Sequence, residues 1–158
     1  MIGLLQRVGC ASVEVEGKPV AAIGRGLLVF IAVERGDREA QAERLLQRLL
    51  AYRVFPDAAG RMHRDVREIG GGLLLVPQFT LAADTRSGNR PSFTPAAPPE
   101  QGKYLFTYLY KQSVRVHAAT QCGLFGADMQ VSSVNDGPVT FWLKVPPDSE
   151  SREDVDCS

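Results

Sequence analysis

The sequence predicts an α+β fold, in which a twisted, mostly antiparallel sheet or open β-barrel carries two helices. Three observations lead to this prediction. Residues 2–33 consist of strand-like runs joined by short turns, two later segments have buried-type residues at helical spacing, and further strand-like runs follow each of those segments. The resulting order, β-β-β-α-β-β-α-β-β, is typical of an α+β fold.

The N-terminal region is expected to form three strands. Val13-Glu14-Val15-Glu16 alternates apolar and charged residues, and Gly17-Lys18-Pro19 then turns the chain. A second turn at Ile23–Gly26 precedes the continuous apolar run Leu27–Val33. Because this run is too short for a convincing helix and has no polar face, it predicts a central strand that is buried on both faces.

Two segments are predicted to be helices. The first has Asp37 as its N-cap and runs to about Tyr52. The second spans Pro99 to about Val116, and proline suits the first turn of a helix. The stripes that predict them are Ala42, Leu45, Leu46 and Leu49 in the first helix, and Leu105, Tyr108, Leu109 and Gln112 in the second.

Between these helices the sequence predicts two strands and a long loop. A short strand around Arg53–Phe55 precedes a turn at Pro56–Gly60. The apolar strand Leu73–Val76 leads into Pro77-Gln78-Phe79-Thr80-Leu81. Residues 83–99 are rich in Gly, Pro, Ser and Asn, and loops of that length are more often functional than accidental.

Beyond the second helix, strands are expected at Met129–Val134 and Val139–Val145. From Pro146 the composition changes to Pro, Ser, Asp and Glu, which favours disorder. We therefore expect one domain over residues 1–146 and a disordered C-terminal tail over residues 147–158.

Composition excludes several classes of protein. Lys and Arg together number 18, as do Asp and Glu, so the net charge is zero, whereas a general polyanion binder is usually basic. Any contact with RNA is therefore expected to be local, and binding to DNA is not expected. The N-terminus does not resemble a signal peptide, and no apolar run reaches the roughly 18 residues of a membrane helix. Three widely spaced cysteines argue against a disulfide framework and favour the reducing cytoplasm.

The side chains offer little conventional catalytic chemistry. His63 and His117 lie at no triad spacing from a nucleophile, and no cluster has the spacing of metal ligands, so neither a metal nor another cofactor is expected. Thr80 places a hydroxyl directly after an apolar strand, but threonine is also favoured within sheets, and without a partner base its hydroxyl is a poor nucleophile. A site here would act mainly through backbone groups, positioning and oxyanion stabilisation.

An unusual piece of backbone is predicted at Asn135-Asp136-Gly137-Pro138-Val139-Thr140. Pro138 lacks an N–H and fixes its own φ, while Gly137 can take φ values that are closed to other residues. From these six residues alone, the simplest interpretation is a tight turn between two strands.

Set beside residues 77–81, however, this segment resembles a known family. Pro77-Gln78-Phe79-Thr80-Leu81 is similar to the S-Q-F-T-L motif of D-aminoacyl-tRNA deacylases, and residues 135–140 match their N-x-G-P-V-T motif. The similarity covers about residues 1–145, in order and at fitting spacing, and leaves out the tail. Further matching segments are Gln6-Arg7-Val8, Ala11-Ser12-Val13, residues 88–93 and residues 125–131.

The resemblance implies a homodimeric enzyme that hydrolyses the ester of D-amino acids, or of glycine, mischarged on tRNA. In the family the Gly-Pro bond is cis and enters the active site of the partner subunit, so Gly137 and Pro138 would exclude L side chains in trans. Either the hydroxyl of Thr80 or the 2′-hydroxyl of the tRNA's last ribose would be the reacting group. The resemblance further implies that Gln78, Phe79 and Thr80 line the pocket, with Thr80 and Gln78 the candidate catalytic residues, and that Phe125, Gly126 and Met129 receive the terminal adenosine at the 3′ end.

One residue departs from the family pattern. Pro77 replaces the usual serine, which removes a hydroxyl and a backbone donor. A related group that removes L-alanine has P-Q-A-T-L here, but it pairs that motif with T-N-G-P-Y-T, whereas this chain keeps Phe79 and Asn135–Thr140. The D-specific interpretation is therefore preferred. The alternatives are a relaxed or L-alanine-directed deacylase, and an RNA- or DNA-binding module without catalysis.

Overall fold

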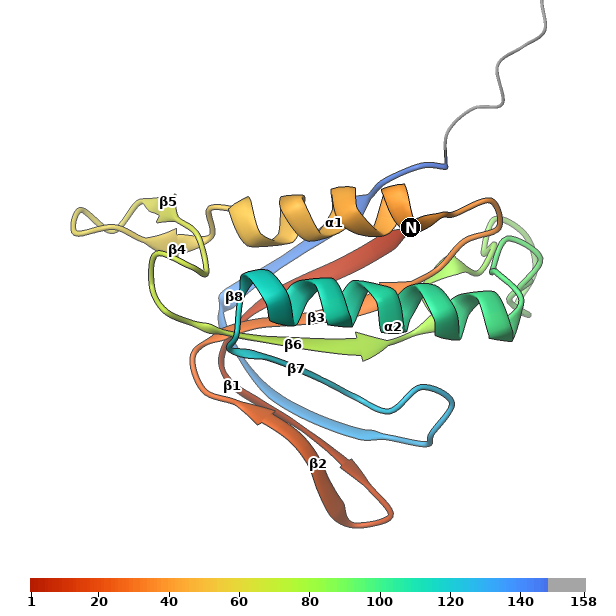
Figure 1. Cartoon of the computed structure of the whole chain (residues 1–158), viewed down its shortest axis with the longest axis horizontal. Helices are drawn as coiled ribbons and strands as arrows, with labels where there is room; N and C mark the ends of the chain where they lie inside the picture. Colours follow the sequence, from red (N-terminus) through yellow and green to blue (C-terminus); the bar gives the residue numbers. More distant parts are fainter. Residues whose placement is uncertain (148–158) are drawn as a thin grey trace, which may run out of the picture.

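A computed structural model describes residues 1–147 and confirms the α+β fold (Figure 1). Two helices lie along the same face of a strongly bent, nearly closed sheet. The strands are β1 (Ile2–Val15), β2 (Lys18–Ile23), β3 (Gly26–Ala32), β4 (Phe55–Pro56), β5 (Met62–Arg64), β6 (Gly72–Pro77), β7 (Thr120–Cys122) and β8 (Gln130–Lys144). The helices are α1 (Glu39–Ala51), the 3₁₀-helix η1 (Phe79–Ala82) and α2 (Pro99–Val116).

The long strand β1 organises the main sheet. Along one edge it pairs antiparallel with β8, and along the other edge with β3 and then with β2. The sheet continues in parallel from β3 to β6 and from β6 to β7. The sheet is therefore mixed: antiparallel around β1, as the sequence predicts, and parallel on the side that carries residues 72–77.

Strand β3 is buried on both faces, which confirms the prediction for Leu27–Val33. Leu27, Val29 and Ile31 pack in the core beneath the helices, whereas Leu28 packs in a second core on the opposite face. The same alternation continues in β6. Burial on both faces explains why these two strands lack the apolar–polar alternation of a half-exposed strand.

The predicted N-cap of the first helix is wrong by one residue. Helix α1 begins after Arg38, whose backbone N–H donates to the Gln41 side chain at 2.9 Å. Asp37 is buried instead, where its carboxylate accepts hydrogen bonds from the Met1 amine at 2.7 Å and from the Glu34 N–H at 2.7 Å. Burial raises the pKa of Asp37 above its usual value. The Asp37 carboxylate therefore binds the Met1 amine, which is distant in sequence, and does not cap the helix as the local pattern predicts.

Several other differences lie in short elements. Helix α2 has the predicted bounds, but the strand predicted at Arg53–Phe55 lies at Phe55–Pro56 and pairs with the unpredicted β5. The unpredicted β7 is only three residues long. A strand this short has too few residues to show a periodicity, so its existence depends on its parallel pairing with β6.

The two C-terminal strands predicted at Met129–Val134 and Val139–Val145 are one strand, β8, interrupted by a bulge. Within residues 1–147, no helix has the length and apolar character needed to cross a bilayer. The predicted tail, residues 147–158, lies outside the described residues except for Pro147.

Candidate active site

Two adjoining cavities open where β6 passes into η1, close to the start of α2. The first has a volume of about 240 Å³ and is lined almost entirely by apolar side chains, and the second has a volume of about 330 Å³. Both share the walls formed by Pro77, Gln78, Phe79, Phe125 and Gly126. The first adds Ile31, Val33, Ala97, Pro99, Gly102 and Phe106, and the second adds Val76, Ala127, Asp128, Met129 and Val131.

The end of strand β7 creates this opening. The last β6–β7 pair joins Leu75 to Cys122, and Gly123 then donates its N–H to the Leu75 carbonyl at 2.8 Å. The N–H of Leu73 points toward β7, whereas that of Gln78 points toward β3. Because backbone direction alternates along a strand, residue 77 faces Gly123, which directly follows β7. Proline at this position therefore removes a backbone N–H from the side of β6 that faces Gly123.

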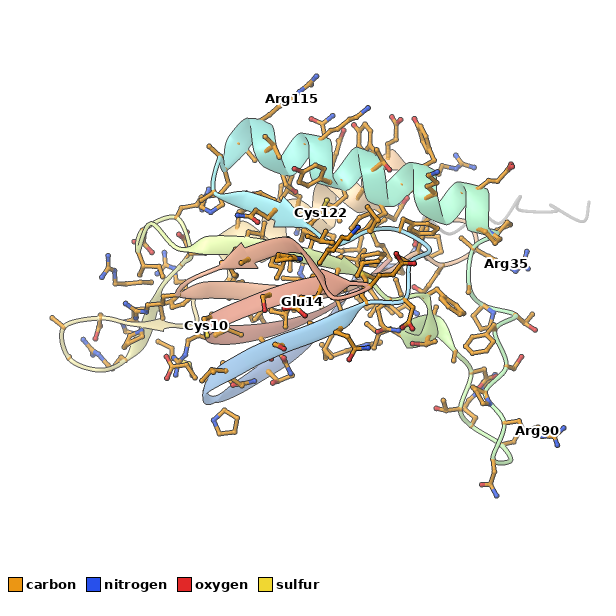
Figure 2. The ribbon with its side chains drawn as sticks, turned by 90° about the horizontal axis from the view of Figure 1, so that it is seen from below. Cys10, Glu14, Arg35, Arg90, Arg115 and Cys122 are labelled. Atoms are coloured by element: carbon orange, nitrogen blue, oxygen red, sulfur yellow. The ribbon has the colours of Figure 1, made fainter. Side chains whose placement is uncertain are left out.

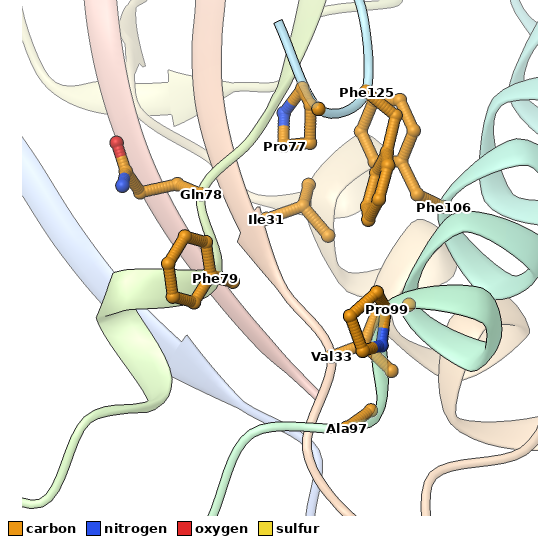
Figure 3. A pocket seen from close by; sticks show the side chains of 11 residues that line it. Ile31, Val33, Pro77, Gln78, Phe79, Ala97, Pro99, Phe106 and Phe125 are labelled. Carbon is orange, nitrogen blue, oxygen red and sulfur yellow. The ribbon is translucent and has the colours of Figure 1, made fainter. Parts of the chain in front are cut away.

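Aromatic rings form two sides of the first cavity. Figure 3 shows Phe106 and Phe125 together on one side and Phe79 on the other. The centroids of the Phe106 and Phe125 rings are 6.3 Å apart, and Gly102 of α2 lies against the Phe125 ring. Met129 folds back over Gly123, and its sulfur accepts the Leu124 N–H at 3.3 Å.

Thr80 does not belong to the lining of either cavity. It lies exposed on η1, and its hydroxyl accepts a hydrogen bond from the Gln78 amide. An amide donor does not take a proton from a hydroxyl, so this contact gives Thr80 no general base. The structure thus brings together Gln78, Phe79, Phe125, Gly126 and Met129, and leaves Thr80 beside them.

The segment around Gly137 bulges out of strand β8. Gln6 pairs with Thr140 and Val8 pairs with Asn135, so Arg7 alone lies opposite residues 136–139. The segment is not a turn between two strands, because β8 pairs with β1 on both sides of it. The Gly137–Pro138 peptide bond is cis, and both residues are exposed.

Two side chains hold this bulge in place. The guanidinium of Arg7 donates to the carbonyl of Asp136 at 2.8 Å and to that of Val54 at 2.7 Å. Asn135 closes the bulge, since its side-chain oxygen accepts the Val139 N–H at 2.7 Å and its amide donates to Thr140 at 3.0 Å. We refer to residues 135–140 as the Gly-Pro bulge. The sequence does not predict this role of Arg7, because the partners of a single arginine within a strand leave no pattern in the sequence.

The Gly-Pro bulge lies far from the cavities of its own chain. Val131 lines the second cavity, and the rise of about 3.3 Å per residue along β8 puts roughly 20 Å between Val131 and Gly137. Cys10, which pairs with Val134 next to the bulge, lies at the opposite end of the molecule from Arg35 (Figure 2). Arg35 is bonded to Thr94 in the loop that precedes α2, near the cavities.

The histidines lie away from both cavities. His117 contacts the Gly71 carbonyl at 2.8 Å where α2 ends, and His63 pairs with Asp57 at 3.1 Å on the β4–β5 hairpin. Among the described residues, no three His, Cys, Asp or Glu side chains come together as metal ligands would.

Comparison with known proteins shows which family has this fold and these motifs. The family model described as D-Tyr-tRNA(Tyr) deacylase matches residues 4–144. The chain belongs to the D-Tyr-tRNA(Tyr) deacylase family. Enzymes named D-aminoacyl-tRNA deacylase from Thioalkalivibrio sulfidiphilus and Alkalilimnicola ehrlichii are each 62% identical to it, over 93% of this chain and at least 98% of their own length. This deacylase is therefore a hydrolase of the ester bond in D-aminoacyl-tRNA.

Two solved structures share the fold of this chain. One named c-Myc DNA Unwinding Element Binding Protein has a TM-score of 0.89 and 36% identity, covering 92% of the deacylase chain and 99% of its own. A second, described as a probable eukaryotic D-amino acid tRNA deacylase, has a TM-score of 0.80 at 16% identity and shows the same fold.

Proposed function

We propose that the enzyme proofreads chirality, hydrolysing D-aminoacyl and glycyl esters at the 3′ end of tRNA and refusing L-aminoacyl esters. In this proposal the active site is completed in a homodimer, where the Gly-Pro bulge of one subunit enters the cavities of the other. The observation that carries the proposal is the position of the bulge, which is exposed, rigidly held and roughly 20 Å from its own cavities. A motif held this firmly yet outside its own site is suited to act on a second copy.

The cavities would take the terminal adenosine. Phe125, Gly126 and Met129 surround a space of about 330 Å³, and an aromatic ring with a polarisable sulfur suits a purine. Gln78 and Phe79 line both cavities, and the aminoacyl group would lie beside them. The carbonyl oxygens of the partner's bulge would bind the substrate's amino group and leave no room for an L side chain.

The chemistry would depend on positioning rather than on a side-chain base. Phe79 and Thr80 begin a 3₁₀-helix, so their N–H groups have no intrahelical acceptor and are available to an ester carbonyl oxygen. Because Thr80 accepts a bond from Gln78 and contacts no base, we assign the reacting role to the 2′-hydroxyl of the terminal ribose. The single deacylase domain would comprise residues 1–146 and act in the cytoplasm, where tRNA is charged.

Hydrolysis of matched esters tests this function. D-tyrosyl-, L-tyrosyl- and glycyl-tRNA are incubated with the enzyme, and released amino acid is measured with and without EDTA. We expect hydrolysis of the D-tyrosyl and glycyl esters, at least about 100-fold slower hydrolysis of the L-tyrosyl ester, and no effect of EDTA. Equal rates for the D and L esters would overturn the chirality assignment.

Pro77 favours a second candidate, a deacylase of relaxed or L-alanine-directed specificity. Pro77 lines both cavities, and it lacks the hydroxyl and the backbone N–H that a serine would have at this position. Release of L-alanine from a noncognate tRNA, at a rate comparable to that of D-tyrosine, would support this candidate. Rejection of L-alanyl-tRNA would leave the D-specific function.

The name of one structural relative raises a third candidate, a nucleic-acid-binding module without catalysis. The zero net charge of this chain argues against general binding to DNA. Protein that binds tRNA ends or DNA but releases no amino acid from either tyrosyl ester would favour this candidate over the deacylase.

A further inference from the structure

We infer that Phe79 and Phe93 form a second base-binding subsite, outside the cavities, that takes the nucleotide preceding the terminal adenosine. The inference rests on the proposed function. The Phe79 and Phe93 side chains are 57% and 41% exposed, and their rings are 5.1 Å apart at an angle of 55°. Two adjacent phenylalanine rings open to solvent are uncommon in a folded chain and call for an occupant.

Hydrogen bonds and an ion pair within the loop that carries Phe93 hold the ring in its exposed position. The backbone of Asp84 pairs with that of Ser92 across the loop, and the Asp84 carboxylate binds the Arg86 guanidinium at 2.7 Å. This contact with Arg86 lowers the pKa of Asp84 to about 2. At the other end of the loop, Arg35 donates to the Thr94 carbonyl, and the Phe93 carbonyl accepts the Ala96 N–H at 3.0 Å.

The position of Phe79 places the subsite directly beside the cavities. Its ring lines both cavities and also contacts Phe93, so it joins the space proposed for the adenosine to the exposed aromatic surface. A base lying against Phe93 would therefore be the direct neighbour of a nucleoside in the cavity. Aromatic side chains bind successive bases of single-stranded nucleic acid in this way, without sequence preference.

The charges around the subsite favour nucleic acid over a protein. Arg35 and Arg90 project from the same end of the molecule, with Arg90 at the tip of the loop that carries Phe93 (Figure 2). Within residues 1–147, Arg90 forms no ion pair, and the carboxylate of Asp84 in the same loop is already bound by Arg86. A cation without a partner beside exposed aromatic rings suits the phosphate that links two nucleotides.

A comparison of two substrates tests the subsite. One is D-tyrosine esterified to adenosine alone, and the other is the same ester on the trinucleotide cytidyl-cytidyl-adenosine. We expect Phe93→Ala to lower kcat/KM for the trinucleotide ester about tenfold, mainly through KM, and to leave the adenosine ester within about twofold of the wild type. Phe93→Trp should retain the wild-type preference for the trinucleotide, because it preserves an aromatic face.

Three outcomes would overturn the subsite: equal loss on both substrates, no loss on either, or a change in the mass of the Phe93→Ala protein in solution. The last result would assign the rings to contact between subunits. Failure of the wild-type enzyme to hydrolyse either ester would instead contradict the proposed function, so the two failures are distinguishable.

A binding measurement supplies a second readout that does not depend on catalysis. The Phe93→Trp/Trp142→Phe protein has one tryptophan within the described residues, at the subsite. The trinucleotide should quench its fluorescence at lower concentrations than adenosine does, because a base stacks on the ring. Identical titrations with the two ligands would contradict the subsite.

Discussion

At the scale of single residues, Arg7 connects the Gly-Pro bulge to the rest of the molecule. Its guanidinium joins the carbonyl of Asp136 to that of Val54, and only 12% of its side chain is exposed. A hydrogen bond from a charged donor contributes about 1.5–3 kcal/mol, so these two bonds tie the bulge to the segment at Val54. The position of Gly137 and Pro138 therefore depends on a side chain from the neighbouring strand.

Replacement of Arg7 should thus impair selection more than folding. We expect Arg7→Ala to lower kcat/KM for D-tyrosyl-tRNA about tenfold or more and to narrow the difference between D and L esters, because the bulge loses its fixed position. Initial rates on the two esters measure both effects. Arg7→Lys serves as the control and should recover part of the loss, since it keeps the positive charge but has one nitrogen where arginine donates from two separate nitrogens. Unchanged rates for Arg7→Ala would contradict this role.

The hydroxyl of Thr80 should be dispensable for most of the rate. Thr80→Ala removes the acceptor of the Gln78 amide but no base, so we expect activity on D-tyrosyl-tRNA to stay within about tenfold of the wild type. Single-turnover hydrolysis, with circular dichroism to verify the fold, measures this. Complete loss of activity in a folded protein would make Thr80 the nucleophile.

The two cysteines of the described chain should differ in reactivity. Burial raises the pKa of Cys122, so less of its reactive thiolate is present at a given pH, whereas Cys10 is exposed. We expect iodoacetamide at pH 8 to modify Cys10 first, and modification of Cys122 to accelerate as the pH rises. Peptide mapping by mass spectrometry separates the two sites, and urea should abolish the difference. Faster modification of Cys122 in the native protein would be inconsistent with its burial.

At the scale of elements, the sequence predicts best where burial sets a periodic pattern. Helix α2 and the doubly buried β3 were correctly predicted because their apolar residues repeat over many positions. Strand β7 and the N-cap of α1 were missed because each depends on a distant partner: β6 in the first case, and the Met1 amine that binds Asp37 in the second. Local sequence patterns do not predict contacts with partners that are distant in the sequence.

The parallel pair β3–β6 requires glycine at its start. A Cβ added to Gly26 would lie 2.0 Å from the carbonyl oxygen of Gly72, which is backbone and has no room to move. We expect Gly26→Ala to lower the free energy of unfolding by about 3 kcal/mol or more in urea denaturation. Gly24→Ala is the matched control, because a Cβ there meets nothing within 4 Å, and its effect should stay within about 0.5 kcal/mol. Equal losses in the free energy of unfolding for the two variants would show that the close contact between Gly26 and Gly72 does not require glycine.

At the scale of the whole molecule, the sequence predicted several residues that share a cavity, but it did not predict how the segments around that cavity are arranged. Gln78, Phe79, Phe125, Gly126 and Met129 do line one cavity. The motifs did not reveal that β8 continues through the Gly-Pro bulge, because continuity depends on pairing with β1 on both sides. They also gave no indication of the first cavity, whose walls at Ala97, Gly102 and Phe106 come from segments without a motif.

The arrangement of the whole molecule also offers a surface for the second copy that we propose. Within residues 1–147, strand β8 pairs with β1 along one edge only, and it carries the exposed side chains Val134 and Trp142 on either side of the bulge. A free edge with exposed apolar side chains is a surface suited to association. Residues that contact the partner are therefore expected on β8, next to the motif that would enter the partner's cavity.

Complementation between two inactive variants tests this account most directly. One variant carries Gly137→Ala and Pro138→Ala, and the other carries Phe125→Ala and Met129→Ala, so neither homodimer has a complete site. After subunit exchange, verified by native mass spectrometry, each mixed dimer would hold one intact cavity facing one intact bulge. The account predicts recovery of about a quarter of the wild-type activity on D-tyrosyl-tRNA. A mixture that forms mixed dimers yet stays inactive, or a protein that is monomeric and fully active, would contradict it.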